Sequence, residues 1–326
     1  MKAFTYKSAK TEEEAVQALG PGALPLAGGT TLLNLMKDRV VEPSVLVNLK
    51  SIRGFDKIEA AGAGLRIGAG VTLASLLENP AVVKQYPAIA QALETVATPQ
   101  IRNMATIGGN LCTRPPCWYF SHDLFACAKR GNANTCPARE GENEYHAIFA
   151  NEGPCVAVHG SSVAPALVAF DGSVRVAGPG GAREIPLEKF FALPKADVLK
   201  ENVLAGNEIV THVSIGKGNA KSATYVVLPK ESHDWPTSLA SVALEMSGEM
   251  CSGAKVVLWA VAPIPWRASG AEAVLAGKKI TPEVASAAAE AAVKGAMPLS
   301  QNAYKIQTTK AAVRRAVLMA ATGKWS

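Results

Sequence analysis

The sequence predicts an α+β protein with two regions that join near residue 217. In the first region, strand-like segments alternate with short amphipathic helices. In the second, strand-like runs come first and two alanine-rich helices close the chain. We therefore expect one domain over residues 1–217 and a second over 218–326, with a Gly- and Lys-rich linker around 215–222.

The first region opens with alternating elements. A short strand is expected at residues 2–8 and a helix at 11–19, where Thr11 and Glu14 have the spacing of a capping box. An apolar strand then turns through Gly28 and Gly29 into a helix. The remaining expected elements are a strand at 44–50, a strand and a helix within 64–83 that is capped near Thr72, and a helix from 86 to a turn at Pro99.

The rest of the chain continues the pattern after an interruption. A second Gly-Gly turn at 108–109 precedes residues 112–155, which show little periodicity. A helix and strands resume between 161 and 215. In the second region we expect strands at 224–230, 238–248 and 254–268, and helices at 282–296 and 305–323.

Composition narrows the functional class. Hydrophobic residues make up 48% and charged residues only 18%, below the roughly 25% usual in soluble domains, which suggests that part of the exterior meets another protein. The net charge of +6 is spread without basic blocks, so nucleic acid is not indicated. The start lacks the pattern of a signal peptide, and we expect a cytoplasmic protein, or a periplasmic one if a signal-bearing partner carries it.

Two Gly-Gly segments are candidates for binding a phosphate-bearing ligand. "LAGGTTLL" and "TIGGNL" each place two glycines beside threonines. Glycine permits positive φ and close approach of a ligand, and consecutive N–H groups suit a pyrophosphate. Either segment alone also fits an ordinary tight turn. Neither matches GxGxxG or a P-loop, so those nucleotide sites are not supported.

Five cysteines crowd into residues 112–155, which we call the cysteine-rich segment. They are Cys112, Cys117, Cys127, Cys136 and Cys155. The spacings contain no close knuckle of the kind that usually binds zinc, and a disulfide framework would suit a secreted chain. Zinc, disulfides, free thiols and an iron–sulfur cluster held by four thiolates all remain open from the residues alone.

The motifs taken together carry a family resemblance. "LAGGTTLLNLMK", "IGAGVTLASLL", "PQIRNMATIGGNL", "APALVAFD" and "PLSQNAYKI" occur in this order. The chain closely resembles the FAD-binding subunit of the xanthine oxidase family of molybdenum hydroxylases. The resemblance implies two α/β subdomains that clasp FAD, in the fold shared with vanillyl-alcohol oxidase, and a C-terminal domain of a small antiparallel sheet and a helix bundle.

The resemblance also implies the residues that contact FAD. The two glycine segments match the pyrophosphate and ribityl loops of the family. Ser161 and Ser162 stand where the family commonly has Ser-Asp, so a hydroxyl replaces a carboxylate near the flavin. Lys230 and Trp235 match a region near the isoalloxazine. The full set is Leu26, Ala27, Gly28, Gly29, Thr30, Thr31, Leu32, Thr98, Thr106, Gly108, Gly109, Asn110, Ser161, Ser162, Lys230 and Trp235.

The cysteine-rich segment matches a subset of that family. Subunits resembling those of 4-hydroxybenzoyl-CoA reductase and periplasmic aldehyde oxidoreductases carry an insertion of similar place and length that holds a [4Fe–4S] cluster. The resemblance implies that the ligands are Cys117, Cys127, Cys136 and Cys155. Cys112 falls outside this pattern and is expected to be a free thiol, and Cys251 is expected to be structural.

Other conspicuous side chains receive structural interpretations. His122, His146 and His159 are expected to make polar contacts to the loop or to FAD. The aromatic run 118–120 is expected to pack the segment and shield the cluster. The pair His233 and Asp234 has no nucleophile pattern near it, and Arg314 with Arg315 is expected on a solvated or intersubunit face.

The resemblance implies a function in electron transfer. The chain would be the flavoprotein subunit of a heterotrimer, with a large molybdopterin subunit, a small subunit bearing two [2Fe–2S] clusters, and an external carrier such as ferredoxin. No residue of this chain would act as acid or base on the organic substrate. Two alternatives remain: a standalone flavin oxidoreductase with its own substrate pocket, and a zinc-loop scaffold without enzymatic activity.

Overall fold

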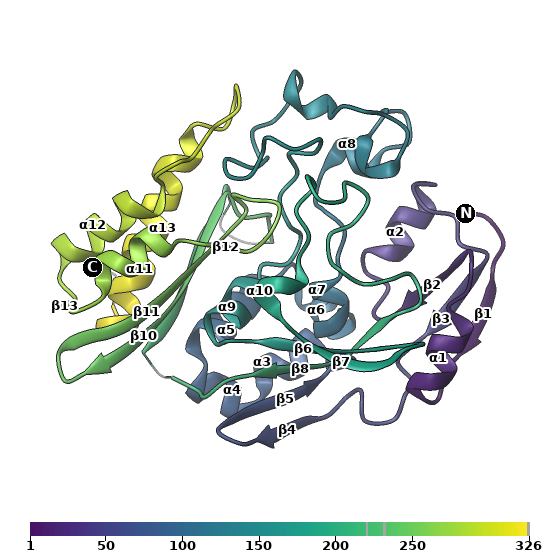
Figure 1. Ribbon diagram of the computed structural model, residues 1–326, viewed down its shortest axis with the longest axis horizontal. Coiled ribbons are helices and arrows are strands. Elements are labelled where there is room, and N and C mark those ends of the chain that lie inside the picture. The colour runs from purple at the N-terminus through teal and green to yellow at the C-terminus, as the bar shows by residue number, and fades with distance from the viewer. Residues whose placement is uncertain (220, 231–232, 325–326) are drawn as a thin grey trace.

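The computed structural model describes residues 1–219, 221–230 and 233–324. It confirms the predicted α+β class. Figure 1 shows a small sheet at the N-terminal end, a larger sheet in the middle and a third sheet covered by helices at the C-terminal end. The cysteine-rich segment lies above the middle of the molecule, between the two ends.

The N-terminal sheet is parallel, with strand order β1-β3-β2. The Thr11 side chain caps the first helix by accepting a hydrogen bond from the Glu14 N–H at 3.2 Å. Glu14 in turn accepts from the N–H of Lys10 rather than of Thr11. The elements are β1 (Thr5–Ser8), α1 (Glu12–Ala18), β2 (Ala23–Leu26), α2 (Leu32–Lys37) and β3 (Val45–Asn48).

The middle sheet is antiparallel, with strand order β4-β5-β8-β6-β7. Its strands are β4 (Ile58–Ala61), β5 (Gly64–Gly68), β6 (Ser173–Gly178), β7 (Gly181–Pro186) and β8 (Ile209–Ile215). Strand β4 was not predicted, because it is short and mostly exposed and so has no apolar alternation. Its helices are α3 (Leu73–Glu78), α4 (Pro80–Gln85), α5 (Pro87–Glu94), α6 (Pro99–Met104), α7 (Ile107–Leu111), α9 (Ala164–Ala169) and α10 (Leu187–Phe190).

The second predicted Gly-Gly turn is wrong. Gly108 and Gly109 lie inside the short helix α7, whose N-cap is Thr106. A Cβ on Gly108 would lie 2.7 Å from the Cβ of Ala69. Glycine is needed here because the helix packs closely on the neighbouring backbone, and that tertiary contact overrides the low helix propensity of glycine.

The C-terminal region is an antiparallel sheet with helices against it. The order is β12-β11-β10-β9, and β13 pairs with β11. Helix α13 packs on β9 and β10, and α12 packs on α13 (Figure 1). Helix α11 was not predicted. The elements are β9 (Ser222–Val227), β10 (Ser238–Ser247), β11 (Met250–Trp259), β12 (Trp266–Arg267), α11 (Ser269–Leu275), β13 (Lys278–Lys279), α12 (Pro282–Ala292) and α13 (Tyr304–Thr322).

The cysteine-rich segment has little regular structure, as predicted. It contains α8 (Trp118–Ser121) and two single-turn helices, η1 (Ala128–Arg130) and η2 (Pro137–Arg139). Near its end, Ile148 and Phe149 pack into the apolar core of the C-terminal region. The segment is therefore part of the folded interior and links the two ends of the molecule.

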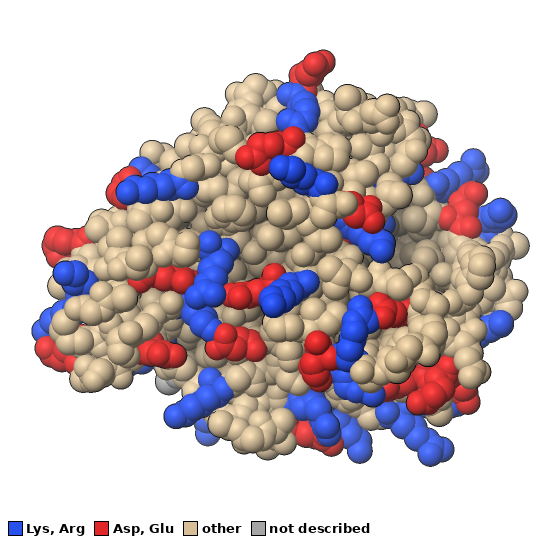
Figure 2. All heavy atoms as spheres, in the orientation of Figure 1, with Lys and Arg blue, Asp and Glu red and all other residues tan. Residues whose placement is uncertain are grey.

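The surface agrees with the modest charge of the sequence. On the face shown in Figure 2, basic and acidic side chains are interspersed, with wide neutral areas between them. Among the described residues, no helix has both the length and the apolar character needed to cross a bilayer. Arg314 and Arg315 are both partly exposed, and the Arg315 guanidinium lies over the Tyr225 ring of β9, 5.0 Å from the centroid, and bonds its hydroxyl.

Candidate functional site

The two glycine segments, far apart in sequence, lie directly against each other. A Cβ built on Gly28 would lie 2.1 Å from the carbonyl oxygen of Met104 and 2.9 Å from the Cα of Ala105. Gly29 has a φ of +75°, which favours glycine. Backbone therefore meets backbone at Gly28, which leaves no room for a side chain, whereas Gly29 gives the turn after β2 its left-handed conformation.

The glycine amides of the first segment are free within the described ranges, whereas those of the second are engaged. The Gly108 N–H donates to Ala69 at 3.0 Å, and the Gly109 N–H donates to the Thr106 hydroxyl at 3.2 Å. By contrast, the N–H groups of Gly28 and Gly29 have no hydrogen-bond acceptor within the described ranges. The predicted donor array thus fits the first segment, whereas the second supports it from behind.

Polar side chains tie these segments to the rest of the site. The hydroxyls of Thr31 and Thr113 lie 3.0 Å apart. The Ser161 hydroxyl donates to the Asn110 side-chain oxygen at 2.6 Å and accepts from the Ala164 N–H at the start of α9. The structure therefore brings Ser161, with the buried Ser162 next to it, beside the second glycine segment.

The segment around Trp235 reaches the same region. The side chain of His233 lies 3.2 Å from the carbonyl of Ala97, next to Thr98, which caps α6. The Trp235 ring lies 6.1 Å from that of Trp259, whose indole N–H donates to the carbonyl of His159.

Lys230 is a surface side chain. Its side chain is 79% exposed and lies 3.8 Å from Asp234. Asp234 also accepts from the Trp235 N–H, so Asp234 and His233 are engaged with different partners. The intervening residues 231 and 232 of the predicted stretch lie outside the described residues.

Four cysteines of the cysteine-rich segment gather in one apolar pocket. Cys117, Cys127, Cys136 and Cys155 are all buried and belong to the same cluster of side chains, with Tyr119 and Phe120. All six cysteines of the chain are free thiols in the structure. The four that sequence reasoning assigned as ligands are thus brought together from separate turns of a 39-residue stretch, residues 117–155.

The thiols influence one another. The contact between the Cys155 and Cys136 thiols lowers the pKa of Cys136 and raises the pKa of Cys155. Burial raises the pKa of Cys117 to about 12. Holding Cys117 and Cys155 as thiolates would therefore require a compensating positive charge nearby, which a metal centre would provide.

Cys112 and Cys251 stand apart from this pocket. Cys112 packs against the main core of the first region, and burial raises its pKa to about 12. Cys251 is buried in β11, where its thiol donates to the carbonyl of Gly253 at 3.1 Å. Both positions agree with the structural roles expected for these residues.

Aromatic and histidine side chains enclose the pocket. Tyr119 and Phe120 are buried, and Trp118 is partly exposed. The Nε2 atom of His146 lies 3.3 Å from the Cys117 sulfur, which confirms the predicted contact to the loop. Burial, with the Lys305 charge nearby, lowers the pKa of His146 to about 4, so the imidazole is neutral.

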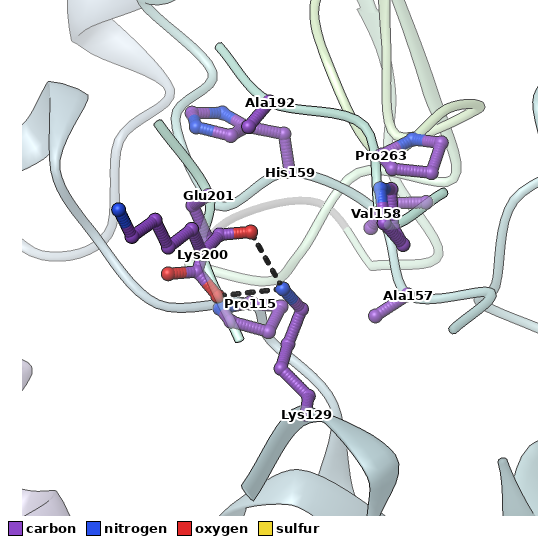
Figure 3. Close-up of a pocket in the computed structure, with 10 residues that line it drawn as sticks. Pro115, Lys129, Ala157, Val158, His159, Ala192, Lys200, Glu201 and Pro263 are labelled. Atoms are coloured by element: carbon purple, nitrogen blue, oxygen red, sulfur yellow. Dashed lines mark hydrogen bonds and ion pairs between the residues drawn. The ribbon is translucent and has the colours of Figure 1, made fainter. Parts of the chain in front are cut away.

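A buried ion pair ties the cysteine-rich segment to residues 198–201 (Figure 3). The Lys129 ammonium lies 2.9 Å from the Glu201 carboxylate and donates to the carbonyls of Val198 and Lys200. Arg114 approaches the same carboxylate at 3.2 Å. Sequence reasoning missed Lys129 and Glu201, because 72 positions separate them and neither stands in a motif.

His159, Lys129 and Glu201 line the same small cavity of about 10 Å³, and Figure 3 shows the His159 ring beside Ala192. Its Nδ1 accepts from the Ser161 N–H at 3.0 Å, and burial lowers its pKa to about 3. His122, in contrast, is exposed, in a cleft of about 350 Å³ between the end of α2 and the cysteine-rich segment.

A second buried cation holds the segment on the side of the C-terminal helices. The Lys305 ammonium of α13 donates to the carbonyls of Tyr145, His146 and Ala260 at 2.8, 3.0 and 2.6 Å. Asn302 donates to the His146 carbonyl at 3.1 Å. Both residues stand in the motif "PLSQNAYKI", but the motif alone did not predict this contact.

The types of donor present suit the chemistry of both predicted groups. The tight glycine backbone and its free amides suit a pyrophosphate, and four buried thiols beside aromatic rings suit an iron–sulfur cluster. No group of three or more His, Cys, Asp or Glu side chains in the described part of the chain is arranged to hold a metal ion. The cluster therefore enters below as a proposal.

Comparison with known proteins agrees with the geometry. The architecture is an α+β FAD-binding fold. The family described as "FAD binding domain in molybdopterin dehydrogenase" matches residues 2–217, and "CO dehydrogenase flavoprotein C-terminal domain" matches residues 223–320. The chain belongs to the FAD-binding medium subunits of the xanthine oxidase family, and it is an oxidoreductase subunit.

The relatives extend over nearly all of the chain. The aldehyde oxidoreductase FAD-binding subunit PaoB of Escherichia coli (strain K12) is 33% identical over 95% of this chain and 96% of its own length. The carbon monoxide dehydrogenase medium chain of Hydrogenophaga pseudoflava is 29% identical, over 89% and 86%.

Two solved structures share this fold over nearly the whole chain. A carbon monoxide dehydrogenase from Hydrogenophaga pseudoflava that lacks the Mo-pyranopterin moiety of the molybdenum cofactor matches with a TM-score of 0.76 and 27% identity. That match covers 98% of this chain and 97% of the other. Quinoline 2-oxidoreductase from Pseudomonas putida 86 matches with a TM-score of 0.77 and 25% identity, over the full length of both chains.

Proposed function

We propose that this chain is the FAD- and [4Fe–4S]-containing electron-transfer subunit of a heterotrimeric molybdenum hydroxylase. Its complex would oxidise an aldehyde, an aromatic compound or an N-heterocycle, or reduce an acyl-CoA. The observation that carries the proposal is the gathering of four buried thiols in one pocket, in a segment that begins where the glycine segments end.

FAD would lie along the two glycine segments. The free amides of Gly28 and Gly29 would bind the pyrophosphate, with Thr30, Thr31 and neighbouring residues beside it. Asn110 and Ser161, already bonded to each other, would present their polar atoms to the ribityl chain or the ring. The wider proposed set is Leu26, Ala27, Leu32, Thr98, Thr106, Gly108, Gly109, Ser162, Lys230 and Trp235.

The cluster would be held by Cys117, Cys127, Cys136 and Cys155. Four thiolates are the usual donor set for a [4Fe–4S] cluster, and solvent exclusion helps to set its potential. The buried rings of Tyr119 and Phe120 would exclude water from the pocket. Cys112 would remain a free thiol outside the cluster.

Three partners complete the proposed complex. A large molybdopterin subunit would carry the substrate, a small subunit with two [2Fe–2S] clusters would connect it to this chain, and an external carrier such as ferredoxin would exchange electrons with it. The relatives named as medium chains support this composition. The complex would be cytoplasmic, or periplasmic if a signal-bearing partner exports it.

Within this complex the chain would bind and orient redox groups rather than perform acid–base chemistry. Bound FAD supplies chemistry that couples two-electron and one-electron transfer. The chain's own residues would hold its phosphates, fix the ring and exclude water. A first domain over 1–217 would carry FAD and the cysteine-rich segment, and a second over 218–326 would cover the segment through Lys305 and Asn302.

Metal and flavin analysis of two matched variants tests the proposal. Wild-type protein should contain one FAD and about four irons per chain, as expected for a [4Fe–4S] cluster. The Cys117→Ser variant should lose most of the iron, and the matched Cys112→Ser variant should keep it. One zinc per chain without iron, or equal iron loss in both variants, would contradict the ligand assignment.

A further inference from the structure

One imidazole lies directly against a proposed cluster ligand. The Nε2 atom of His146 is 3.3 Å from the sulfur of Cys117, which is within hydrogen-bonding distance for sulfur. His146 is 3% exposed and Cys117 is 6% exposed. Water therefore does not compete for this contact, and its electrostatic effect on the sulfur is not screened.

The direction of the hydrogen bond follows from the proton count. A cysteine that binds iron is a thiolate and has no proton to give. The proton between the two atoms must then be on Nε2, because an unprotonated ring nitrogen and a thiolate are both acceptors and would repel each other at this distance. The other ring nitrogen, Nδ1, is buried and has no partner among the described residues. In this tautomer Nδ1 carries no proton and is an unpaired acceptor, so the ring has no buried N–H group that lacks an acceptor.

The position of His146 is fixed through its backbone and its ring. Its N–H donates to the Asn143 carbonyl at 3.0 Å. Its own carbonyl accepts from Asn302 and from the Lys305 ammonium. The ring meets that of Trp118 edge to face, with centroids 5.7 Å apart. The imidazole is thus held in place before any metal centre forms.

We propose that His146 donates a hydrogen bond to the Cys117 thiolate and raises the reduction potential of the cluster. The proposal rests on the [4Fe–4S] function proposed above. An N–H group aimed at a ligand sulfur stabilises negative charge there, and the reduced cluster carries one more negative charge than the oxidised one. The bond therefore favours the reduced form, and its loss should lower the potential.

Redox titration of three variants tests this role. In His146→Leu, the one-electron equilibrium should shift roughly tenfold towards the oxidised cluster, which corresponds to about 59 mV. In His146→Gln, the side-chain amide can donate to the sulfur and should recover at least half of that shift. His122→Leu, at an exposed histidine of the same segment, serves as the matched control and should leave the potential unchanged.

The possible results of these measurements distinguish the hydrogen-bonding role of His146 from the proposed cluster function. An unchanged potential in His146→Leu with full iron content overturns the role and leaves the cluster in place. Wild-type protein without iron overturns the proposed function and the role together. If His146→Leu fails to bind iron, pulsed EPR of reduced wild-type protein with ¹⁵N-labelled histidine decides. A nitrogen and an exchangeable proton coupled to the cluster support the bond, and their absence overturns it.

Discussion

At the scale of single residues, the glycines of the first segment are the most exacting positions in the candidate site. Gly28 meets the carbonyl of Met104 at a distance that leaves no room for a methyl group. A substitution there must push β2 and α6 apart, and overpacking of this kind costs about 1–3 kcal/mol. The displaced turn would no longer present its amides in one concave array.

We predict that Gly28→Ala weakens FAD binding by roughly tenfold or more, which corresponds to about 1.4 kcal/mol. Gly20→Ala is the matched control, because a Cβ there meets nothing within 4 Å. Flavin fluorescence titration of the apoprotein measures both affinities. Equal affinity in Gly28→Ala and wild-type protein would show that the first glycine segment does not hold the cofactor.

Single residues also mark the limit of what the sequence could predict. The four proposed ligands were identified by family resemblance, and the structure brings them together. The lysine contacts that hold the segment were not foreseen. Lys129 with Glu201, and Lys305 with the carbonyls of 145 and 146, join residues far apart in sequence. In the sequence, a lysine that is buried against carbonyl groups cannot be distinguished from a lysine on the surface.

At the scale of elements, the cysteine-rich segment depends on helix α13 for its position. Lys305 occupies the first turn of that helix, and its ammonium satisfies three buried carbonyls. Burial lowers the pKa of Lys305 to about 7, so the cost of burying the charge offsets part of this gain. The net contribution of the lysine is the difference between these two effects.

We predict that Lys305→Met lowers the free energy of unfolding by about 2 kcal/mol, because unpaired buried acceptors cost about 1–3 kcal/mol each while the charge burial is relieved. The matched control, Lys294→Met, replaces an exposed lysine and should change the free energy little. Urea denaturation followed by circular dichroism compares them. A Lys305→Met protein as stable as wild type would contradict the structural importance of the three bonds.

Elements were predicted best where local signals act alone. The threonine caps at Thr11, Thr72 and Thr281 all begin helices, of which the first two were predicted as caps. Helix α7 was mistaken for a turn because its two glycines have low helix propensity and are explained only by the packing of Gly108 on Ala69. Strand β4 and helix α11 escaped prediction because each is short.

At the scale of the whole molecule, the overall fold class followed from the alternation of strands and helices and from the order of the family motifs. The path of the cysteine-rich segment did not, because no periodicity describes it. Its aliphatic end at Ile148 and Phe149 joins the C-terminal core. The cysteine-rich segment therefore lies within the first region in sequence, but the second region supplies the core against which its end packs.

We predict that the isolated chain turns over no organic substrate, and that activity appears only with the large and small subunits. Co-expression of the three proteins should yield a complex with one copy of each in the assembly unit, measured by light scattering after size exclusion. Matched assays of the chain alone and of the complex use the same aldehyde and N-heterocycle panel. Turnover by the isolated chain would favour a standalone flavin oxidoreductase instead.

The contact of Lys305 with the cysteine-rich segment sets an order of events during synthesis. Lys305 lies close to the C-terminal end of the chain, whereas the four thiols have left the ribosome long before it. Chains begin to fold from the N-terminal side while they are still being made. We therefore expect the four thiols to be accessible until α13 docks. Iron for the proposed cluster would be delivered before that step.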